Sequence, residues 1–251
     1  LASCEKEIQL NLNESDPQIV IEGWVSDQPG PYDIKITQST NYFDNEAIPG
    51  VSGATVTIQD DMGTTDVLTE VQPGLYRTTT LQGQIGHNYV LTVVIGDQSY
   101  EAHSYLPRIG PIDTSFSIYS PQTGFLEEGY YIVSAANEPA GQGDFYRFRF
   151  YQNDSLYDGP FDYFLTDDRF VDGQLATVQF PYAVELGDTC IIEIQSLTNQ
   201  AYDFYLSLFS ELTSAGSPFG APPANLTGNI SNKALGFFGA MSIERDTVIV
   251  R

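Results

Sequence analysis

The stretch Asn88-Tyr-Val-Leu-Thr-Val-Val-Ile95, followed by Gly96-Asp97 and Ser99-Tyr-Glu-Ala-His-Ser-Tyr105, contains the strongest fold signal in the sequence. A buried run, a two-residue turn and a partner run together predict a β-hairpin. Shorter strands separated by turn signals precede it, beginning at Gln18. About seven strands in roughly ninety residues are typical of an antiparallel sandwich, which we expect over residues 18–107.

The remainder, residues 108–251, predicts a second sandwich that carries one helix. Leu106-Pro-Arg-Ile-Gly-Pro111 cannot continue a strand, because two prolines and a glycine interrupt it, so we expect the two domains to join there. Asp144-Phe-Tyr-Arg-Phe-Arg-Phe-Tyr151 alternates ring and arginine side chains, as a strand with two different faces does.

One segment of the second half has helical rather than strand periodicity. Apolar side chains at Ala201, Tyr205, Leu208 and Leu212 predict a helix near residues 198–213. Thr198 or Ser196 can cap its start. We expect this helix to pack across the open end or one face of the second sandwich.

The charge balance excludes several functions. The chain has 33 Asp or Glu and 10 Lys or Arg, which gives a formal net charge of −23. Nucleic acid needs a Lys/Arg surface to replace its counterions, and anionic lipid needs a basic patch, so neither is an expected partner. The sequence contains no apolar run of the length that a transmembrane helix requires.

The first residues, Leu1-Ala-Ser-Cys4, resemble a bacterial lipobox, in which small residues precede a cysteine that becomes lipidated. We therefore expect Cys4 to carry a lipid anchor and residues 1–17 to form the lipobox remnant and a tether; a chance cysteine is the alternative. Cys190 then has no disulfide partner, and its apolar neighbours favour a buried free thiol over a bridge to Cys4.

The early strand Val20-Ile-Glu-Gly-Trp24, the segment Tyr202 to Leu212, and the tail Pro222-Pro-Ala-Asn-Leu226 with Ala234-Leu-Gly-Phe-Phe-Gly-Ala240 carry a family resemblance. Together with Cys4 they resemble lipoproteins of the phylum Bacteroidota in the domain-of-unknown-function 4249 family. The first sandwich is similar to immunoglobulin-like and transthyretin-like modules. The family resemblance implies a surface lipoprotein that works with a TonB-dependent, SusC-like barrel, and it implies no catalytic residues.

The ionisable residues limit the chemistry that this chain can perform. His87 and His103 are the only two histidines, so a three-histidine zinc site is excluded, and no nucleophile elbow surrounds a serine. Asp167, Asp168 and Asp172 offer a carboxylate pair for a glycosidase or oxygens for calcium, but a solvated loop is the favoured explanation. We therefore expect no catalytic residue, no metal and no cofactor other than the lipid.

Aromatic residues are the remaining candidates for contact with a partner. A sandwich needs aromatic side chains in its core, so core packing is the favoured explanation for these rings. Tyr157, Phe161, Tyr163 and Phe164 lie near a Gly-Pro turn, and they form the candidate interaction surface if that segment is a loop. Asp154-Ser155-Leu156 and Asp246-Thr247-Val248 resemble a Bacteroidota O-glycosylation motif, which makes Ser155 and Thr247 candidate acceptors.

From these observations we expect a non-enzymatic, lipid-anchored outer-membrane protein, exposed at the cell surface, that associates with a TonB-dependent barrel or a larger envelope assembly. The acidic surface would orient it on its partner and keep it from self-association. The first alternative is a free-standing glycan-binding or peptide-binding lipoprotein. The second is a hydrolase, against which the lack of a nucleophile motif counts.

Overall fold

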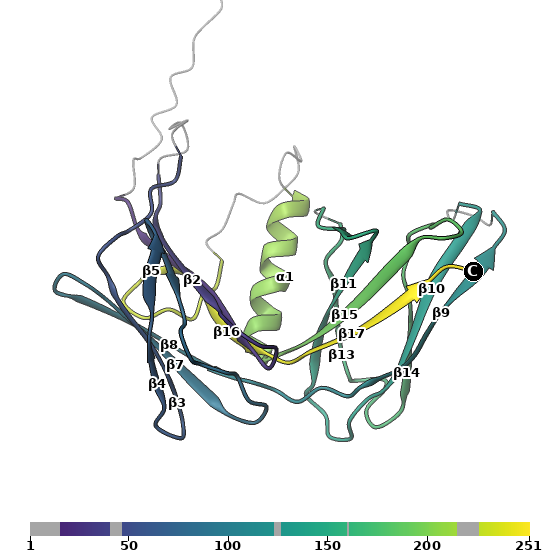
Figure 1. Cartoon of the computed structure of the whole chain (residues 1–251), viewed down its shortest axis with the longest axis horizontal. Coiled ribbons are helices and arrows are strands. Elements are labelled where there is room, and N and C mark those ends of the chain that lie inside the picture. The colour runs from purple at the N-terminus through teal and green to yellow at the C-terminus, as the bar shows by residue number, and fades with distance from the viewer. Residues whose placement is uncertain (1–15, 41–46, 123–126, 160, 215–225) are drawn as a thin grey trace, which may run out of the picture.

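The computed structural model describes residues 16–40, 47–122, 127–159, 161–214 and 226–251, which form two β-sandwiches with a helix between them (Figure 1). The first sandwich contains β1 (Ile19–Ser26), β2 (Asp33–Gln38), β3 (Thr55–Asp60), β4 (Thr65–Val67), β5 (Thr69–Gln72), β6 (Leu75–Arg77), β7 (Asn88–Ile95), β8 (Gln98–Tyr105) and β16 (Leu235–Met241). The second contains β9 (Ile112–Ser120), β10 (Gly129–Asn137), β11 (Phe145–Gln152), β12 (Ser155–Leu156), β13 (Phe164–Asp167), β14 (Leu175–Gln179), β15 (Thr189–Leu197) and β17 (Ile243–Ile249). The helix is α1 (Asn199–Ser214). The predicted mainly β class is confirmed.

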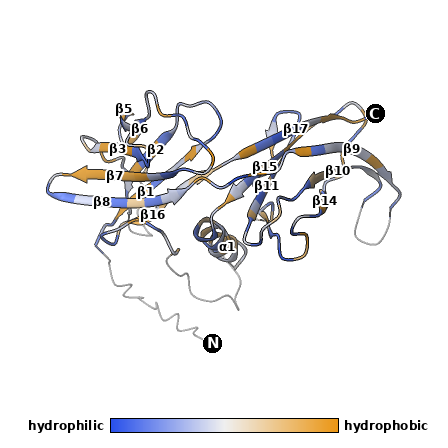
Figure 2. Cartoon of the chain, turned by 90° about the horizontal axis from the view of Figure 1, so that it is seen from below, coloured by the Kyte–Doolittle hydropathy of each residue, from blue (hydrophilic) through white to orange (hydrophobic). Residues whose placement is uncertain are grey.

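The hairpin predicted for residues 88–105 is present. β7 and β8 pair through the two-residue turn, with Ile95 opposite Gln98, and Gly96 has the positive φ of 57° that such a turn requires. Figure 2 shows β7 coloured as apolar and β8 as polar. This difference agrees with the order of the four-stranded sheet, β4-β3-β7-β8, in which β7 is an inner strand and β8 is at the edge.

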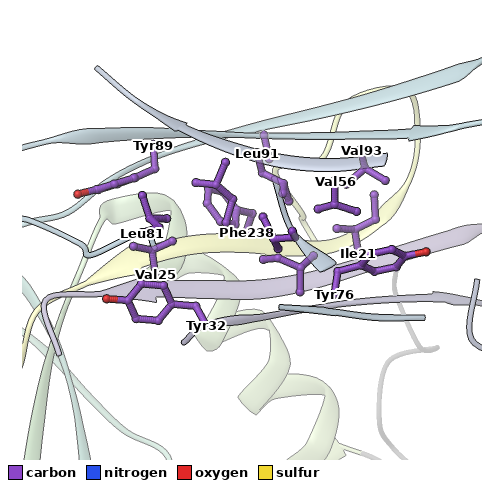
Figure 3. Packing of buried hydrophobic residues seen from close by; sticks show 14 of the residues in the cluster. Ile21, Val25, Tyr32, Val56, Tyr76, Leu81, Tyr89, Leu91, Val93 and Phe238 are labelled. Carbon is purple, nitrogen blue, oxygen red and sulfur yellow. The ribbon is translucent and has the colours of Figure 1, made fainter. Parts of the chain in front are cut away.

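The opposite sheet of the first sandwich has the order β16-β1-β2-β6-β5. Its inner side chains meet those of the β7 sheet in one core, where Ile21, Tyr76, Leu91 and Phe238 are almost completely buried (Figure 3). β16 pairs with β1 in parallel, although it lies in the range 108–251 that the sequence analysis assigns to the second sandwich. The structure corrects that assignment for β16, because Phe238 and Ala240 bury their side chains in the first core.

The second sandwich packs the sheet β14-β10-β9 against the sheet β12-β11-β15-β17, with β13 also pairing with β11. The alternation predicted for residues 144–151 is confirmed: Tyr146, Phe148 and Phe150 are buried in the core between the sheets. Arg147 and Arg149 lie on the other face of β11, beside β15. Cys190 is fully buried and free, as expected, and burial raises the pKa of its thiol to about 11.

The predicted helix is confirmed as α1, and Thr198 caps it by accepting a hydrogen bond from the Ala201 N–H at 3.2 Å. The helix contacts both sandwiches, whereas contact with the second alone was expected. Ala201 and Tyr205 join a third apolar cluster with Phe237 of β16 and the half-buried Trp24 of β1, as well as with rings of the second sandwich. α1 therefore packs on the outer face of the second sandwich and also ties that sandwich to the first.

A small polar cluster lies where the β8–β9 and β16–β17 links pass between the two sandwiches. The Ser242 hydroxyl donates to the Pro107 carbonyl at 2.6 Å, and the Ser196 hydroxyl lies 2.7 Å from that of Ser242. Ser242 separates β16 from β17, so one nearly continuous strand runs from the first sandwich into the second. In the described part of the chain, no helix is long and apolar enough to cross a membrane.

Candidate functional site

The four aromatic residues of the candidate interaction surface are dispersed by the structure. Tyr157 and Phe164 pack on the core of the second sandwich, where the Tyr157 ring lies 4.1 Å from that of Tyr182. Tyr163 lies on the opposite side of the sheet, with the third apolar cluster. Only Phe161 is strongly exposed, at 76%. Core packing, the favoured explanation for these rings, accounts for three of the four.

The two candidate glycosylation residues are both on the surface. Ser155 is exposed directly after the turn that joins β11 to β12, and Thr247 is exposed on β17. Cys4, the expected lipidation site, lies outside the described residues. The geometry therefore leaves both hydroxyl groups accessible, and the modifications themselves remain predictions.

A different group of residues is assembled at one end of the second sandwich, around the loop that joins β13 to β14. Glu138, Asp168 and Asp172 each place a carboxylate oxygen within 4.8 Å of the others. Glu138 and Asp168 are 7% and 2% exposed. Sequence reasoning singled out the two aspartates but missed Glu138, because thirty residues of chain separate it from them and only folding brings them together.

Each of these carboxylates holds a neighbouring loop through a backbone amide. The Gly173 N–H donates to Glu138 at 2.7 Å, the Gly143 N–H to Asp168 at 2.8 Å, and the Gly141 N–H to Asp172 at 2.7 Å. The Tyr146 hydroxyl also donates to Glu138, at 3.2 Å. The carboxylates thus fasten residues 141–143 and the segment Thr166–Gly173 to the sandwich.

Burial raises the pKa of Glu138, and the adjacent Asp144 carboxyl raises it further, while the hydrogen bonds from Gly173 and Tyr146 act in the opposite direction. The Arg108 guanidinium binds the residues that follow Glu138. It donates to Asp144 at 3.1 Å and to the Ala140 carbonyl at 2.9 Å. Among the described residues, no Lys, Arg or His forms an ion pair with Glu138, Asp168 or Asp172.

These three acids are the residues that could hold a metal. Calcium prefers six to eight oxygens, and loop carbonyls usually complete its shell. Here the carbonyls of Pro139, Ala140 and Gly141 are within reach of the Arg108 guanidinium. The described arrangement is therefore better suited to bracing loops than to surrounding a calcium ion.

Two pockets flank the Thr166–Gly173 segment, and both include Asp167. The first, of about 200 Å³, enters the sandwich between its sheets; its lining is largely apolar and includes Ala136, Phe148 and Val178. The second, of about 460 Å³, lies at the start of α1 and is lined by Gln142, Gly143, Phe145, Asp167, Asp168, Arg169, Asn199, Tyr202 and Asp203. Phe170, which borders the first pocket, is 88% exposed. We call this assembly the β13–β14 loop site.

The family model described as "Domain of unknown function (DUF4249)" matches residues 5–247. The chain belongs to the DUF4249 family. No curated protein matches its sequence. The resemblance drawn from the Trp24 strand, the helix and the tail is thus confirmed at the level of the family.

Two solved structures show a distant similarity to this DUF4249 chain. One is a pullulanase complexed with maltotriose from Anoxybacillus sp. LM18-11, at 12% identity and a TM-score of 0.25, covering 71% of this chain and 24% of that one. The other is a DUF4785 family protein from Legionella pneumophila subsp. pneumophila str. Philadelphia 1, at 9% identity and a TM-score of 0.27, covering 73% of this chain and 53% of that one. The DUF4249 chain thus spans about a quarter of the first protein and about half of the second.

The two histidines of the DUF4249 chain are both far in sequence from the loop site and serve local contacts. His87 lies 2.6 Å from Asp61, and the hydrogen bonds from His87 and Asn88 lower the pKa of Asp61 to about 2. His103 lies 2.7 Å from Glu101 on the same strand. His87 lies directly before β7.

Proposed function

We propose that this chain is a non-catalytic, lipid-anchored accessory subunit at the cell-surface face of the outer membrane, where it captures a ligand or partner for a TonB-dependent, SusC-like barrel through the β13–β14 loop site. The observation that carries the proposal is Phe170, an aromatic ring that is 88% exposed on a loop fastened by two buried carboxylates. Exposed aromatic anchors on pre-organised loops are typical of binding surfaces.

The proposal of binding over catalysis rests on how the acids of the site are used. A glycosidase needs one carboxyl group to protonate a leaving group and another to face the substrate. Glu138 and Asp168 are buried and accept backbone N–H bonds from other loops. These contacts favour a structural role for both acids.

The second candidate function is a free-standing glycan-binding lipoprotein. The polar pocket at the start of α1 favours it, because amide and carboxylate groups there lie beside Phe145 and Tyr202, whose rings are 4.9 Å apart. Hydrogen-bonding groups next to a ring suit sugar hydroxyls and the apolar face of a sugar. This function predicts glycan binding by the purified protein without any barrel.

Replacing Phe170 with alanine should reduce recovery of the partner barrel at least about tenfold, because a central aromatic anchor contributes roughly 2 kcal/mol or more to binding. The measurement is affinity purification after mild detergent extraction of the native membrane, with the barrel quantified relative to the tagged chain. Phe161→Ala is the matched control, since Phe161 is also a strongly exposed ring, at 76%. Equal barrel recovery from wild type and Phe170→Ala would refute the role of the loop, and recovery of no barrel from wild type would refute the subunit proposal.

Replacing Cys4 with alanine or serine should release the protein from the membrane into the soluble fraction, because it removes the thiol that carries the proposed lipid anchor. Fractionation followed by mass spectrometry of the N-terminal peptide measures both location and acylation. Cys190→Ser is the control for general loss of a thiol. Wild-type protein that is membrane-bound without a lipid on Cys4 would contradict the anchoring proposal.

A further inference from the structure

The first pocket of the β13–β14 loop site has the dimensions and lining of a small-molecule site. Side chains from both sheets of the second sandwich surround it, among them Ala136 of β10, Phe148 of β11 and Val178 of β14. Its volume is about 200 Å³. An apolar protein cavity of roughly 150 Å³ accommodates benzene, so a single substituted ring fits here.

Acidic groups also line this pocket. Glu138 and the hydroxyl-bearing Tyr146 are part of the lining, together with Asp167. Asp167 is paired with Arg169 at 2.6 Å, whereas Glu138 and the nearby Asp168 and Asp172 form no ion pair within the described chain. In a partly water-excluded site, such charges attract a cation and repel an anion.

The mouth of the pocket has an aromatic residue in position to contact an occupant. Phe170 and Val171 belong to both the lining and the loop, and Phe170 is almost fully exposed. The hydrogen bonds from Gly173 to Glu138 and from Gly143 to Asp168 hold that loop in place. A ring that enters the pocket can therefore bury part of Phe170 without first ordering the loop.

We propose that this pocket binds the ring of a small aromatic molecule that is neutral or cationic, and that it excludes anionic analogues. The ring lies between the two sheets, and its polar substituent points toward Glu138. This inference deepens the proposed function and rests on it in one respect only, namely that the β13–β14 loop site is where the chain binds its ligand.

Three probes that share one ring separate the contributions of shape and charge: benzylammonium, benzyl alcohol and phenylacetate. Fragments of this size bind with a Kd on the order of 1 mM. We expect benzylammonium to bind at least about tenfold more tightly than phenylacetate at low salt, with benzyl alcohol between them, and added salt to narrow the difference. Ligand-observed NMR titrations of the full chain provide the three constants.

A pocket-filling variant tests the location. Ala176→Leu adds volume to the lining, whereas Gln179→Leu places the same side chain at an exposed position of the same strand outside the lining. We expect Ala176→Leu to abolish binding of benzyl alcohol and Gln179→Leu to leave it unchanged. Ala136→Leu, from the position opposite Ala176 in the sheet, is the second filling variant if circular dichroism shows that Ala176→Leu misfolds.

Glu138→Gln tests the charge. It should weaken benzylammonium binding several-fold more than benzyl alcohol binding, because the amide removes the charge for both ligands alike but only the cation depends on that charge. The amide keeps one of the two acceptor oxygens that Gly173 and Tyr146 use, so the ratio of the two constants is the readout. No saturable binding of any probe, binding that survives both filling variants, or tighter binding of phenylacetate than of benzylammonium would each overturn the proposal. Loss of the probes with intact Phe170-dependent barrel recovery would remove this ligand class and leave the proposed function standing.

Discussion

Replacing Glu193 with alanine is expected to lower the free energy of unfolding by about 3 kcal/mol. Glu193 is fully buried on the outer face of β15, where Arg149 donates to it at 3.2 Å and the Arg245 Nε donates at 2.7 Å. The Gln195 amide also donates, at 2.6 Å. Removing one partner of a buried ionic group typically costs about 3–5 kcal/mol, and the lower end applies because both guanidinium groups keep access to water.

Urea denaturation followed by circular dichroism measures this loss. The triple variant Arg149→Met/Glu193→Leu/Arg245→Met should recover stability to within about 1 kcal/mol of wild type, because replacing a whole buried ionic group by apolar side chains removes the desolvation cost as well. Glu101→Ala is the control, since Glu101 is exposed on β8 and its loss should change stability by less than about 0.5 kcal/mol. A Glu193→Ala variant as stable as the control would show that the buried carboxylate is dispensable.

The sequence predicted the elements whose turn residues, apolar spacing and caps lie close together in the chain. The β7–β8 hairpin follows from an apolar run and a Gly-Asp turn, and α1 follows from apolar spacing with Thr198 as its cap. The parallel pairing of β16 with β1 has no such signal. It joins segments more than two hundred residues apart, and its register depends on side chains such as Phe238 fitting the core of the first sandwich.

The candidate site was harder to predict than the fold for a related reason. Asp168 and Asp172 are visible in the sequence as acidic loop residues, but their partner Glu138 directly follows β10, thirty residues earlier. The pocket is lined by side chains of both sheets, so it forms only when the sheets pack together. The aromatic residues near the Gly-Pro turn illustrate the opposite error. Phe164 begins β13 and Tyr163 directly precedes it, and neighbouring residues of an extended segment point to opposite faces. The two rings therefore join different apolar clusters, and proximity in sequence does not make them one surface.

The placement of α1 connects stability to the proposed site. The start of α1 lines the polar pocket through Asn199, Tyr202 and Asp203. The same helix presents Tyr205 to Trp24 of the first sandwich, with ring centroids 5.5 Å apart and nearly parallel planes. The first sandwich therefore supports the binding end of the second through a small set of stacked rings, and loss of that support should affect both stability and the orientation of the sandwiches.

Replacing Trp24 with alanine is expected to lower the free energy of unfolding by about 3 kcal/mol. This is the lower end of the range for truncating a large aromatic side chain in a core, because Trp24 is only half-buried. The indole also stacks on Phe237, at 5.5 Å. Since Trp24 is the single tryptophan of the chain, unfolding must be followed by circular dichroism rather than by its fluorescence. Small-angle scattering of the folded variant should show a broader distribution of distances between the sandwiches.

An independent variant reaches the same contact from the other side. A Cβ on Gly239 would lie 1.9 Å from the Trp24 ring, so Gly239→Ala must displace the indole and should reproduce part of both effects while leaving the tryptophan in place. Phe116→Ala, which truncates a ring that is 44% exposed on β9, is the control and should leave the scattering profile unchanged. If Trp24→Ala and Gly239→Ala both kept the wild-type profile and lost less than about 1 kcal/mol, the rings would not be what holds the two sandwiches in their relative orientation. The polar cluster of Ser196, Ser242 and Pro107 would then be the next contact to break, because it joins the β8–β9 link at Pro107 to the β16–β17 link at Ser242.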